Sequence, residues 1–121
     1  MRIITINVNG IRAAERKGFF NWLKKQNADV VCLQEIKAQE DQLDERFYSD
    51  DMHTYYHPAE RKGYSGTGLY CKSKPDKISY SPWEDMNSEG RIIQADFGDM
   101  SVLSIYLPYS GRKYTHKTGK N

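Results

Sequence analysis

Residues 2–8, with the sequence RIITINV, and residues 29–33, with the sequence DVVCL, decide the fold. Both runs are short, apolar and rich in β-branched side chains, which is typical of buried strands. The stretch from Ala13 to Gln26 lies between them and favours a helix, because apolar residues such as Phe19 and Leu23 recur at helical spacing. Together the three segments predict a β-α-β unit, whose two strands lie in one sheet.

The sequence pattern changes after the β-α-β unit. Lys37 to Glu45 is charged and predicts a loop with one or two helical turns. Short strand-like runs separated by turn residues follow, at residues 52–57, 67–72, 77–83, 91–97 and 101–107. The link Phe97-Gly98-Asp99-Met100 predicts a type II′ hairpin, since Gly suits the first central position. A β-α-β unit followed by antiparallel strands indicates an α+β domain.

The composition limits the class of protein. The chain has 121 residues, 28% charged and 38% hydrophobic, which suits one domain or a piece of one. No apolar run approaches the ~18 residues that a transmembrane helix needs. Polar Asn7 and Asn9 stand where a signal peptide would have its apolar core, so we expect a cytoplasmic protein. Cys32 and Cys71 lie in apolar runs and are expected to be buried free thiols.

The charge is unevenly distributed. The chain has 18 Lys and Arg against 16 Asp and Glu, hence a net charge of +2. Four of the basic residues lie between Ser110 and Asn121, where no acid occurs, so the tail carries +4 and the rest −2. We expect residues 110–121 to form a disordered basic tail. Any contact of the domain with nucleic acid would need a local basic patch.

Polar side chains follow both strands of the β-α-β unit. Asn7 ends the first strand, and Gln34 and Glu35 end the second. Side chains at the carboxyl ends of neighbouring strands converge where open sheets tend to bind ligands. A carboxylate beside an amide oxygen suits a hard cation such as Mg²⁺ or Mn²⁺. On spacing alone the alternative stays open that Glu35 begins a loop and Asn7 caps a turn.

Other side chains have both a functional and a structural interpretation. Lys37 could hold the Glu35 carboxylate ionised, and Arg12 could reach a phosphate, or both could be solvated surface charges. Tyr106 ends an apolar strand, where a phenol packs or, alternatively, bonds a phosphate oxygen. The glycines of residues 63–68, GYSGTG, are in the wrong order for a dinucleotide loop. The three histidines show no zinc spacing with the cysteines.

Five ordered blocks of the sequence resemble the exonuclease III-type apurinic/apyrimidinic endonucleases. The blocks are ITINVNGIRA at residues 4–13, ADVVCLQEIK at 28–37, GYSGTG at 63–68, EGR at 89–91 and YLP at 106–108. The resemblance implies the N-terminal half of a four-layer α/β sandwich over residues 1–109, with residues 110–121 unlike the family's continuation.

The resemblance also implies a function. It implies Mg²⁺-dependent (or Mn²⁺-dependent) phosphodiester hydrolysis at abasic sites and 3′ ends of double-stranded DNA, in bacterial-type, nucleoid-associated base-excision repair. By position in the motifs, Asn7 and Glu35 correspond to metal-site residues and Tyr106 to the active-site tyrosine. Arg12, Tyr64 and Ser65 would lie at the rim that faces DNA, and no membrane is implied.

The sequence departs from that family in its second half. The segments that would supply the general base and the remaining metal ligands have no counterpart, and Tyr109 stands where Asn or Ser is usual. We therefore expect this chain to be inactive alone, and to need a complementary C-terminal half for activity. We also expect a marginally stable fold, because one sheet with a single helix leaves a face uncovered. Two alternatives are a non-catalytic nucleic-acid-binding relative and a lipid or inositol-phosphate phosphodiesterase, the latter disfavoured by the NGIRA and QEIK motifs.

Overall fold

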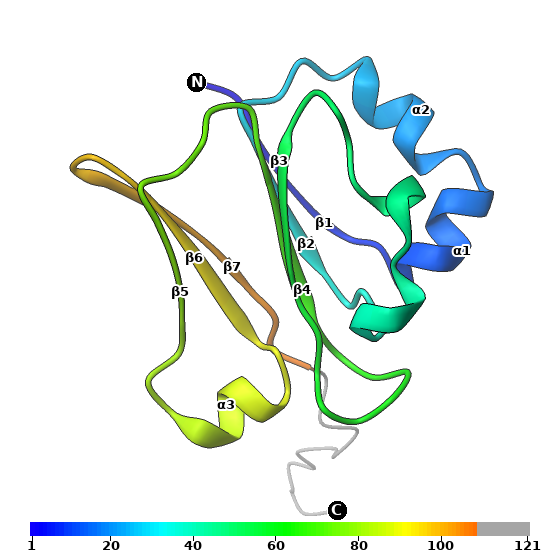
Figure 1. The fold of residues 1–121 in the computed structure, drawn as a ribbon, viewed down its shortest axis with the longest axis vertical. Helices are drawn as coiled ribbons and strands as arrows, with labels where there is room; N and C mark the ends of the chain where they lie inside the picture. Colours follow the sequence, from blue (N-terminus) through cyan, green and yellow to red (C-terminus); the bar gives the residue numbers. More distant parts are fainter. Residues whose placement is uncertain (109–121) are drawn as a thin grey trace, which may run out of the picture.

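Two β-sheets packed face to face form the body of the computed structural model, which describes residues 1–108 (Figure 1). The first sheet has the strand order β1 (Ile3–Asn7), β2 (Val30–Gln34), β4 (Thr67–Cys71) and β3 (His53–His57). Strands β1 and β2 are parallel, whereas β4 is antiparallel to both β2 and β3. The first sheet therefore contains the predicted parallel pair and extends it with two antiparallel strands, as an α+β domain requires.

Two short helices cover the outer face of the first sheet, α1 (Ile11–Arg16) and α2 (Phe19–Lys24). The prediction of one helix from Ala13 to Gln26 is wrong in its continuity. Gly18 has a φ of 93°, in the left-handed region, so it breaks the helix and stands at the N-terminus of α2. The break turns Phe19 and Leu23 into a core of large side chains that also includes Phe47 and Tyr70.

The second sheet has the order β5 (Lys77–Tyr80), β6 (Ile92–Phe97) and β7 (Met100–Ile105), all antiparallel. It covers the inner face of the first sheet, so the expectation of an uncovered face is wrong. The predicted strand runs all contain a strand, although the run 77–83 ends as a strand at Tyr80; strand partners depend on contacts far apart in the sequence. In the β6–β7 hairpin, Phe97 pairs with Met100 and Gly98 has a φ of 62°, which agrees with the predicted turn.

Of three further short helical segments, two were predicted and one was missed. The loop after β2 contains two 3-10 turns, η1 (Glu40–Gln42) and η2 (Glu45–Phe47), as predicted. Helix α3 (Glu84–Ser88) was missed, because residues 77–83 were predicted as one strand. The Ser81 hydroxyl accepts the Trp83 N–H at 3.0 Å, which turns the chain out of the sheet before α3.

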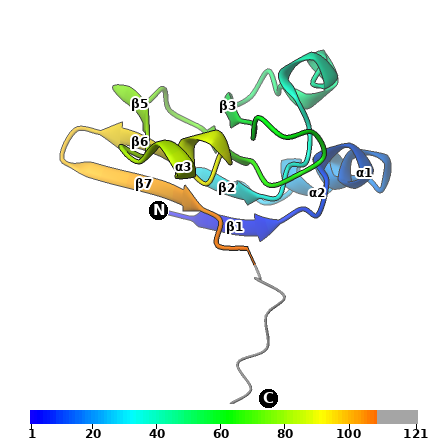
Figure 2. The same cartoon turned by 90° about the horizontal axis from the view of Figure 1, so that it is seen from below.

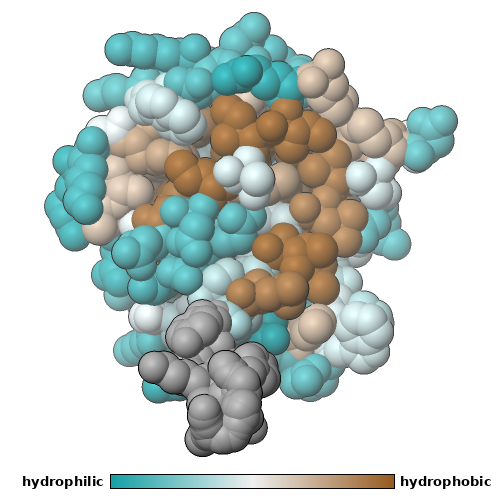
Figure 3. Space-filling model, turned by 180° about the vertical axis from the view of Figure 1, so that it is seen from behind, coloured by the Kyte–Doolittle hydropathy of each residue, from teal (hydrophilic) through white to brown (hydrophobic). Residues whose placement is uncertain are grey.

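The two sheets are offset at one margin of the sandwich. Strand β7 lies over β2 and β4, and β6 lies over β4 and β3, so β1 projects beyond β7 (Figure 2). Apolar side chains gather on the face that carries β1 and β7 (Figure 3). Ile3 is 49% exposed there, and Leu103 and Ile105 are 40% and 45% exposed. Within residues 1–108, no helix combines the length and apolarity needed to cross a membrane.

Cys32 and Cys71 are buried free thiols between the two sheets, as expected. Burial raises the pKa of each thiol from 9.0 to about 11. The basic tail predicted at residues 110–121 lies outside the described residues, and its boundary at residue 109 stays a prediction.

Candidate active site

Side chains from both sheets meet where strands β1, β2 and β7 end. Asn7 is the last residue of β1, Glu35 directly follows β2, and Tyr106 directly follows β7. The phenol of Tyr106 donates a 2.7 Å hydrogen bond to Oε2 of Glu35, across 71 positions of sequence. The packing of the second sheet on the first therefore joins a carboxylate and a phenol that local sequence could not connect.

Glu35 is an ionised carboxylate held among donors. The hydrogen bond from Tyr106 is the largest cause of its lowered pKa; burial, the next largest, acts in the opposite direction, and Asn7 and Lys37 lower the pKa by smaller amounts. Lys37 Nζ lies 3.6 Å from Oε1 of Glu35, and the Glu35 side chain is only 19% exposed. The carboxylate keeps its negative charge well below neutral pH.

The pKa of Tyr106 is raised, whereas that of Glu35 is lowered. Burial, and then the hydrogen bond to Glu35, raise its pKa from 10.0 to about 12. Its phenol is protonated at neutral pH, so it acts as a hydrogen-bond donor or an acid. It cannot serve as a resting general base.

Asn9 and Lys37 hold the turn after β1 against the segment that follows β2. The Asn9 N–H donates to Oδ1 of Asn7 at 2.9 Å, and Lys37 Nζ donates to Oδ1 of Asn9 at 2.8 Å. Because Lys37 also faces Glu35, its ammonium connects the turn after β1 with the carboxylate after β2. Sequence analysis considered Lys37 but missed the part that Asn9 plays.

Backbone strain concentrates at this site. Asn9, Glu35, Lys37 and Ser65 have φ values of 48°, 55°, 52° and 53°, a region that residues other than Gly rarely adopt. Each such residue costs about 1–3 kcal/mol and persists only where its surroundings hold it. Here the backbone is held across segments, since Gly10 N–H donates to the Glu35 carbonyl at 2.8 Å and Lys37 N–H to the Ser65 carbonyl at 2.9 Å.

Arg12, Tyr64 and Ser65, the residues expected at the rim, lie around the same end of the sandwich. Arg12 Nη2 donates to the Lys37 carbonyl at 3.2 Å, which places its guanidinium beside the site. The Tyr64 phenol donates to Oε1 of Glu89 at 3.3 Å. Ser65 is only 2% exposed and its hydroxyl lacks a partner among the described residues, so it meets its neighbours through its backbone.

Sequence analysis missed an ion pair between Glu89 and Arg91 as part of the site. Arg91 Nη2 lies 2.6 Å from Oε1 of Glu89, and the Arg91 carbonyl accepts the Tyr106 N–H at 2.8 Å. Gly90 between them has a φ of 58°, and a Cβ there would lie 2.2 Å from the His57 carbonyl oxygen. The EGR block was recognisable in the sequence. The contact between its Arg91 and Tyr106 forms only because β6 and β7 pair in the second sheet.

The oxygen atoms of Asn7 and Glu35 fit part of a Mg²⁺ site. Oδ1 of Asn7 keeps one lone pair after accepting the Asn9 N–H, and Oε1 of Glu35 has Lys37 no nearer than 3.6 Å. Mg²⁺ is commonly bound through one or two carboxylates while it keeps several waters. No group of three or more His, Cys, Asp or Glu side chains suited to a metal occurs within residues 1–108.

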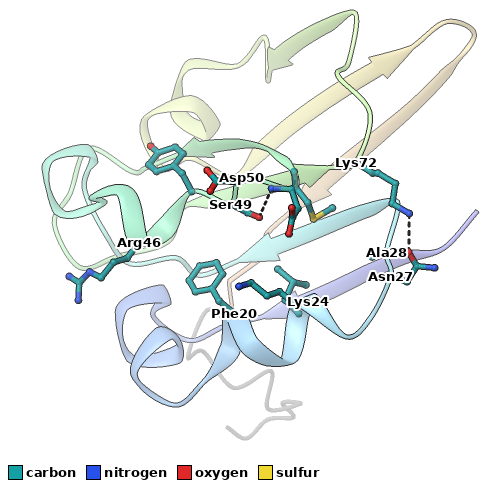
Figure 4. A pocket seen from close by; sticks show the side chains of 12 residues that line it. Phe20, Lys24, Asn27, Ala28, Arg46, Ser49, Asp50 and Lys72 are labelled. Atoms are coloured by element: carbon teal, nitrogen blue, oxygen red, sulfur yellow. Dashed lines mark hydrogen bonds between the residues drawn. The ribbon is translucent and has the colours of Figure 1, made fainter.

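A hollow of about 410 Å³ lies away from this site, between α2 and the segment before β3 (Figure 4). Its wall includes Phe20, Lys24 and Asp50. Arg46 at its edge is held by Asp44 at 2.9 Å, and Lys72 donates to Asn27 at 3.0 Å. Arg46 and Lys72 therefore each have a polar partner within the protein.

Comparison with known proteins identifies relatives of this chain. Residues 4–116 match the sequence model of the Endonuclease/Exonuclease/phosphatase family. An exodeoxyribonuclease of Bacillus subtilis is 41% identical over 114 residues, which is 93% of this chain and 44% of that protein. The DNA repair nuclease APEX1 of Danio rerio is 36% identical over 116 residues, 93% of this chain and 37% of that protein.

A solved structure has the same fold. The catalytic domain of Xenopus laevis APE2 superposes with a TM-score of 0.77 at 27% identity, covering 90% of this chain and 46% of that one. The mixed α+β architecture, with the chain matching one half of a larger sandwich, agrees with the predicted fold class. The chain spans less than half the length of each of these relatives.

Proposed function

Because this chain belongs to the endonuclease/exonuclease/phosphatase family, we propose that it provides one half of a metal-dependent nuclease site that acts on double-stranded DNA at abasic sites and 3′ ends. The observation that carries the proposal is the 2.7 Å hydrogen bond from Tyr106 to Glu35, beside Asn7, at the carboxyl ends of three strands. A carboxylate, an amide and a protonated phenol in one place suit the chemistry of a phosphodiester. The relatives named as nucleases support the same reaction class.

Each residue has a role in this proposal. Asn7 and Glu35 would hold Mg²⁺ or Mn²⁺, which when bound neutralises charge on the phosphate and lowers the pKa of an attacking water. Tyr106 and, to a smaller extent, Lys37 favour the ionised form of Glu35, and Lys37 also positions the turn after β1. Tyr106 remains protonated, and its single O–H, which donates to Glu35 here, would turn to a phosphate oxygen when the substrate binds.

The rim residues bind the DNA backbone. Arg12 lies beside Lys37, and Tyr64 is tied to the site through Glu89. Contacts to phosphates position a duplex without reading its sequence, which suits an enzyme that finds lesions. Ser65 contributes through the backbone of its turn.

The described residues supply an incomplete site, so we propose that a further polypeptide segment completes it. Glu35 is the one carboxylate at the ends of the three strands within residues 1–108. Residues of a catalytic unit act non-additively, so the lack of a general base removes most of the rate. We expect the chain alone to bind DNA and metal but to cleave little.

A binding experiment tests the function of this half. We would measure the affinity of the chain for an abasic-site duplex with and without Mg²⁺, beside Glu35→Gln and the control Glu40→Gln, which changes an exposed acid outside the site. We expect Mg²⁺ to strengthen binding by the chain and the control but not by Glu35→Gln. Mn²⁺ should broaden the NMR signals of Asn7 and Glu35, and its affinity should fall in Glu35→Gln by more than the ~10–100-fold that loss of an outer-shell partner costs.

Cleavage is measured separately. The part of the Bacillus subtilis exodeoxyribonuclease that this chain does not match would be added as a second polypeptide. Cleavage with the chain and not with Glu35→Gln would support the proposal. Equal cleavage with both would overturn the role of Glu35.

The lack of a second carboxylate among the residues that directly follow β1, β2 and β7, within residues 1–108, also favours a second candidate, a non-catalytic DNA-binding relative on the same scaffold. That protein would bind the duplex equally well without Mg²⁺ and would keep its affinity in Glu35→Gln. The same binding series therefore separates the two functions.

A further inference from the structure

The phenol of Tyr106 and the carboxylate of Glu35 belong to different sheets, so their contact depends on how the sheets lie on one another. Glu35 follows β2 of the first sheet, and Tyr106 follows β7 of the second. Strand β7 packs on β2, largely through apolar side chains. Apolar contacts have no preferred direction, so they hold the strands together without fixing the position of β7 along β2. A directional contact is needed for that.

Ser104 is a polar side chain at the apolar interface between the sheets. It is 1% exposed and alternates along β7 with Leu103 and Ile105, which face outward. Its hydroxyl donates to the Leu33 carbonyl of β2 at 2.7 Å. A buried hydroxyl costs free energy unless it is hydrogen-bonded, so a serine is tolerated here because β2 supplies an acceptor. The Cys32 thiol also approaches the Leu103 carbonyl, at 3.8 Å, but a thiol is a weak donor.

Gln34 binds the same hydroxyl and extends the contact to β1. Its Nε2 donates to Ser104 Oγ at 3.1 Å and to Thr5 Oγ1 at 3.0 Å. The direction of the first bond follows from the chemistry of a hydroxyl, which has a single hydrogen. Because Ser104 gives that hydrogen to Leu33, its oxygen can only accept, and the NH₂ group of Gln34 must face it. One amide group therefore links the three strands β1, β2 and β7.

The places of Gln34 and Ser104 in the sequence connect them to the candidate site. Gln34 is the residue before Glu35, and Ser104 is two residues before Tyr106. The Tyr106 N–H continues the pairing of β7 with β6 by donating to the Arg91 carbonyl at 2.8 Å. Residues two apart along such a ladder face the same way, so Ser104 and Tyr106 both face the first sheet. The bond from Tyr106 to Glu35 thus repeats the Ser104 contact one step further along the two strands.

We propose that Gln34 and Ser104 are positioning residues, which hold β7 on β2 in the register that brings the Tyr106 phenol to the Glu35 carboxylate. Hydrogen bonds are stronger where water is excluded. The Ser104 contact is buried, whereas the Glu35 side chain is 19% exposed, so the inner contact determines where the outer one forms. The part that these two residues play in a reaction rests on the proposed function, whereas the positioning of Tyr106 does not.

NMR of the chain without metal or DNA tests the positioning. The Cζ chemical shift of Tyr106 reports the hydrogen bond of its phenol, and a nuclear Overhauser effect between its ring and the Glu35 side chain reports their proximity. Ser104→Ala should move the Cζ signal toward its position in Glu35→Ala, which lacks the acceptor, and should weaken the Overhauser effect. Ser104→Thr keeps a hydroxyl and should restore both signals.

Val102→Ala provides the matched control. Val102 lies two residues earlier on the same face of β7, is 8% exposed and packs in the core between the sheets. Its truncation should lower the midpoint of unfolding but leave both Tyr106 signals in place. Thr5→Val keeps the shape of the side chain and removes one of the two acceptors of Gln34, so it should shift the Cζ signal less than Ser104→Ala does.

Two results would overturn the proposal. One is a Tyr106 signal that does not change in folded Ser104→Ala, and the other is a signal that moves equally in Val102→Ala. Gln34→Met removes both donated bonds at a partly exposed position, and it takes the place of Ser104→Ala if that variant does not fold. The same two results then decide.

A cleavage experiment tests the part of these residues in a reaction. With the remaining part of the Bacillus relative added, Ser104→Ala should lower the turnover of an abasic-site duplex more than its affinity for that duplex, because a displaced phenol costs rate more than binding. Ser104→Thr should recover turnover. Turnover equal to that of the parent in Ser104→Ala would overturn this role. No cleavage with the parent chain would overturn the proposed function, while the NMR shifts would still show that Gln34 and Ser104 position Tyr106.

Discussion

The first sheet buries its two faces against different partners, and the two cores differ in the size of their side chains. On the helix side the core contains Phe19, Phe47 and Tyr70. Between the sheets it contains Cys32 and Ala95 together with aliphatic side chains. Aromatic rings reach the inter-sheet core only partly buried, as Tyr55 and Phe97 do, whereas the helix side buries Phe47 and Tyr70 almost completely. The strands of the first sheet therefore place side chains of different size on their two faces, larger ones toward the helices and smaller ones toward the second sheet.

Truncation on the helix side should have the largest effect. Phe47 is 1% exposed and its ring packs edge-on against Phe20 at 6.1 Å between centroids. Phe47→Ala should lower the free energy of unfolding by about 3–5 kcal/mol, whereas Ile93→Val between the sheets should cost about 0.5–1.5 kcal/mol. Urea unfolding measures both. Equal losses would mean that the two cores do not differ in the way proposed.

A larger side chain should destabilise the core between the sheets more than the core on the helix side. Ala95 is fully buried between the sheets, so Ala95→Leu should cost about 1–3 kcal/mol by forcing the sheets apart. Leu33→Met on the helix side conserves volume and should cost less than about 1.5 kcal/mol. Thermal melts of the two variants provide the measurement. A tolerant Ala95→Leu would indicate spare space between the sheets.

Alkaline pH should weaken the inter-sheet core first. The folded state raises the pKa of the Cys32 and Cys71 thiols to about 11 from 9.0, so it favours their protonated forms. The stability that they contribute is complete below pH 9 and is lost as the pH rises toward 11. Chemical unfolding across this range should show the decline, and the double variant Cys32→Ala with Cys71→Ala should show a shallower one. A parallel slope in the variant would assign the decline to other groups, such as Tyr56 and Tyr70, whose pKa values burial also raises.

The smallest effect concerns the hydrogen bond that links the two sheets at the candidate site. Tyr106→Phe removes the donor to Glu35 and should cost about 0.5–1.5 kcal/mol. The pKa of Glu35 should then rise toward 4.5, because its largest lowering cause is gone. In the parent chain Glu35 contributes stability above pH 4.5 that is lost as the pH falls through its lower folded pKa, and the variant should lose part of this contribution. Carboxyl NMR titration measures the shift, with Tyr80→Phe as control. An unchanged pKa of Glu35 would contradict this account.

The strands were predictable and their partners were not. Runs of β-branched residues bounded by Gly and Pro located the strands within a few residues, since these signals are local. Whether 77–83 joins the same sheet as 67–72 depends on distant contacts, which is why one sheet was expected and two are present. Gly18 was recognised as a weakness in the helix, but its φ of 93° is a tertiary outcome.

The candidate site follows the same rule. Asn7 and Glu35 could be brought together from sequence because parallel neighbours end at the same edge of a sheet. The bond from Tyr106 to Glu35 spans 71 positions and needed the second sheet in place. The link from Tyr64 through Glu89 to Arg91 likewise depends on how the loops pack, since no periodicity in the chain encodes it.

The two sheets are built from consecutive parts of the chain, and this order affects how the protein folds while it is being synthesised. The first sheet uses only residues 3–71 and the second only 77–105, so no strand of one is inserted between strands of the other. On a ribosome the first sheet and its helices can assemble before the second sheet has left the exit tunnel. Its inner face, with Val30, Leu69 and both cysteines, is then exposed for the time needed to make about thirty more residues, at ~5–20 residues per second. That nascent interval is when this chain most needs protection by a chaperone.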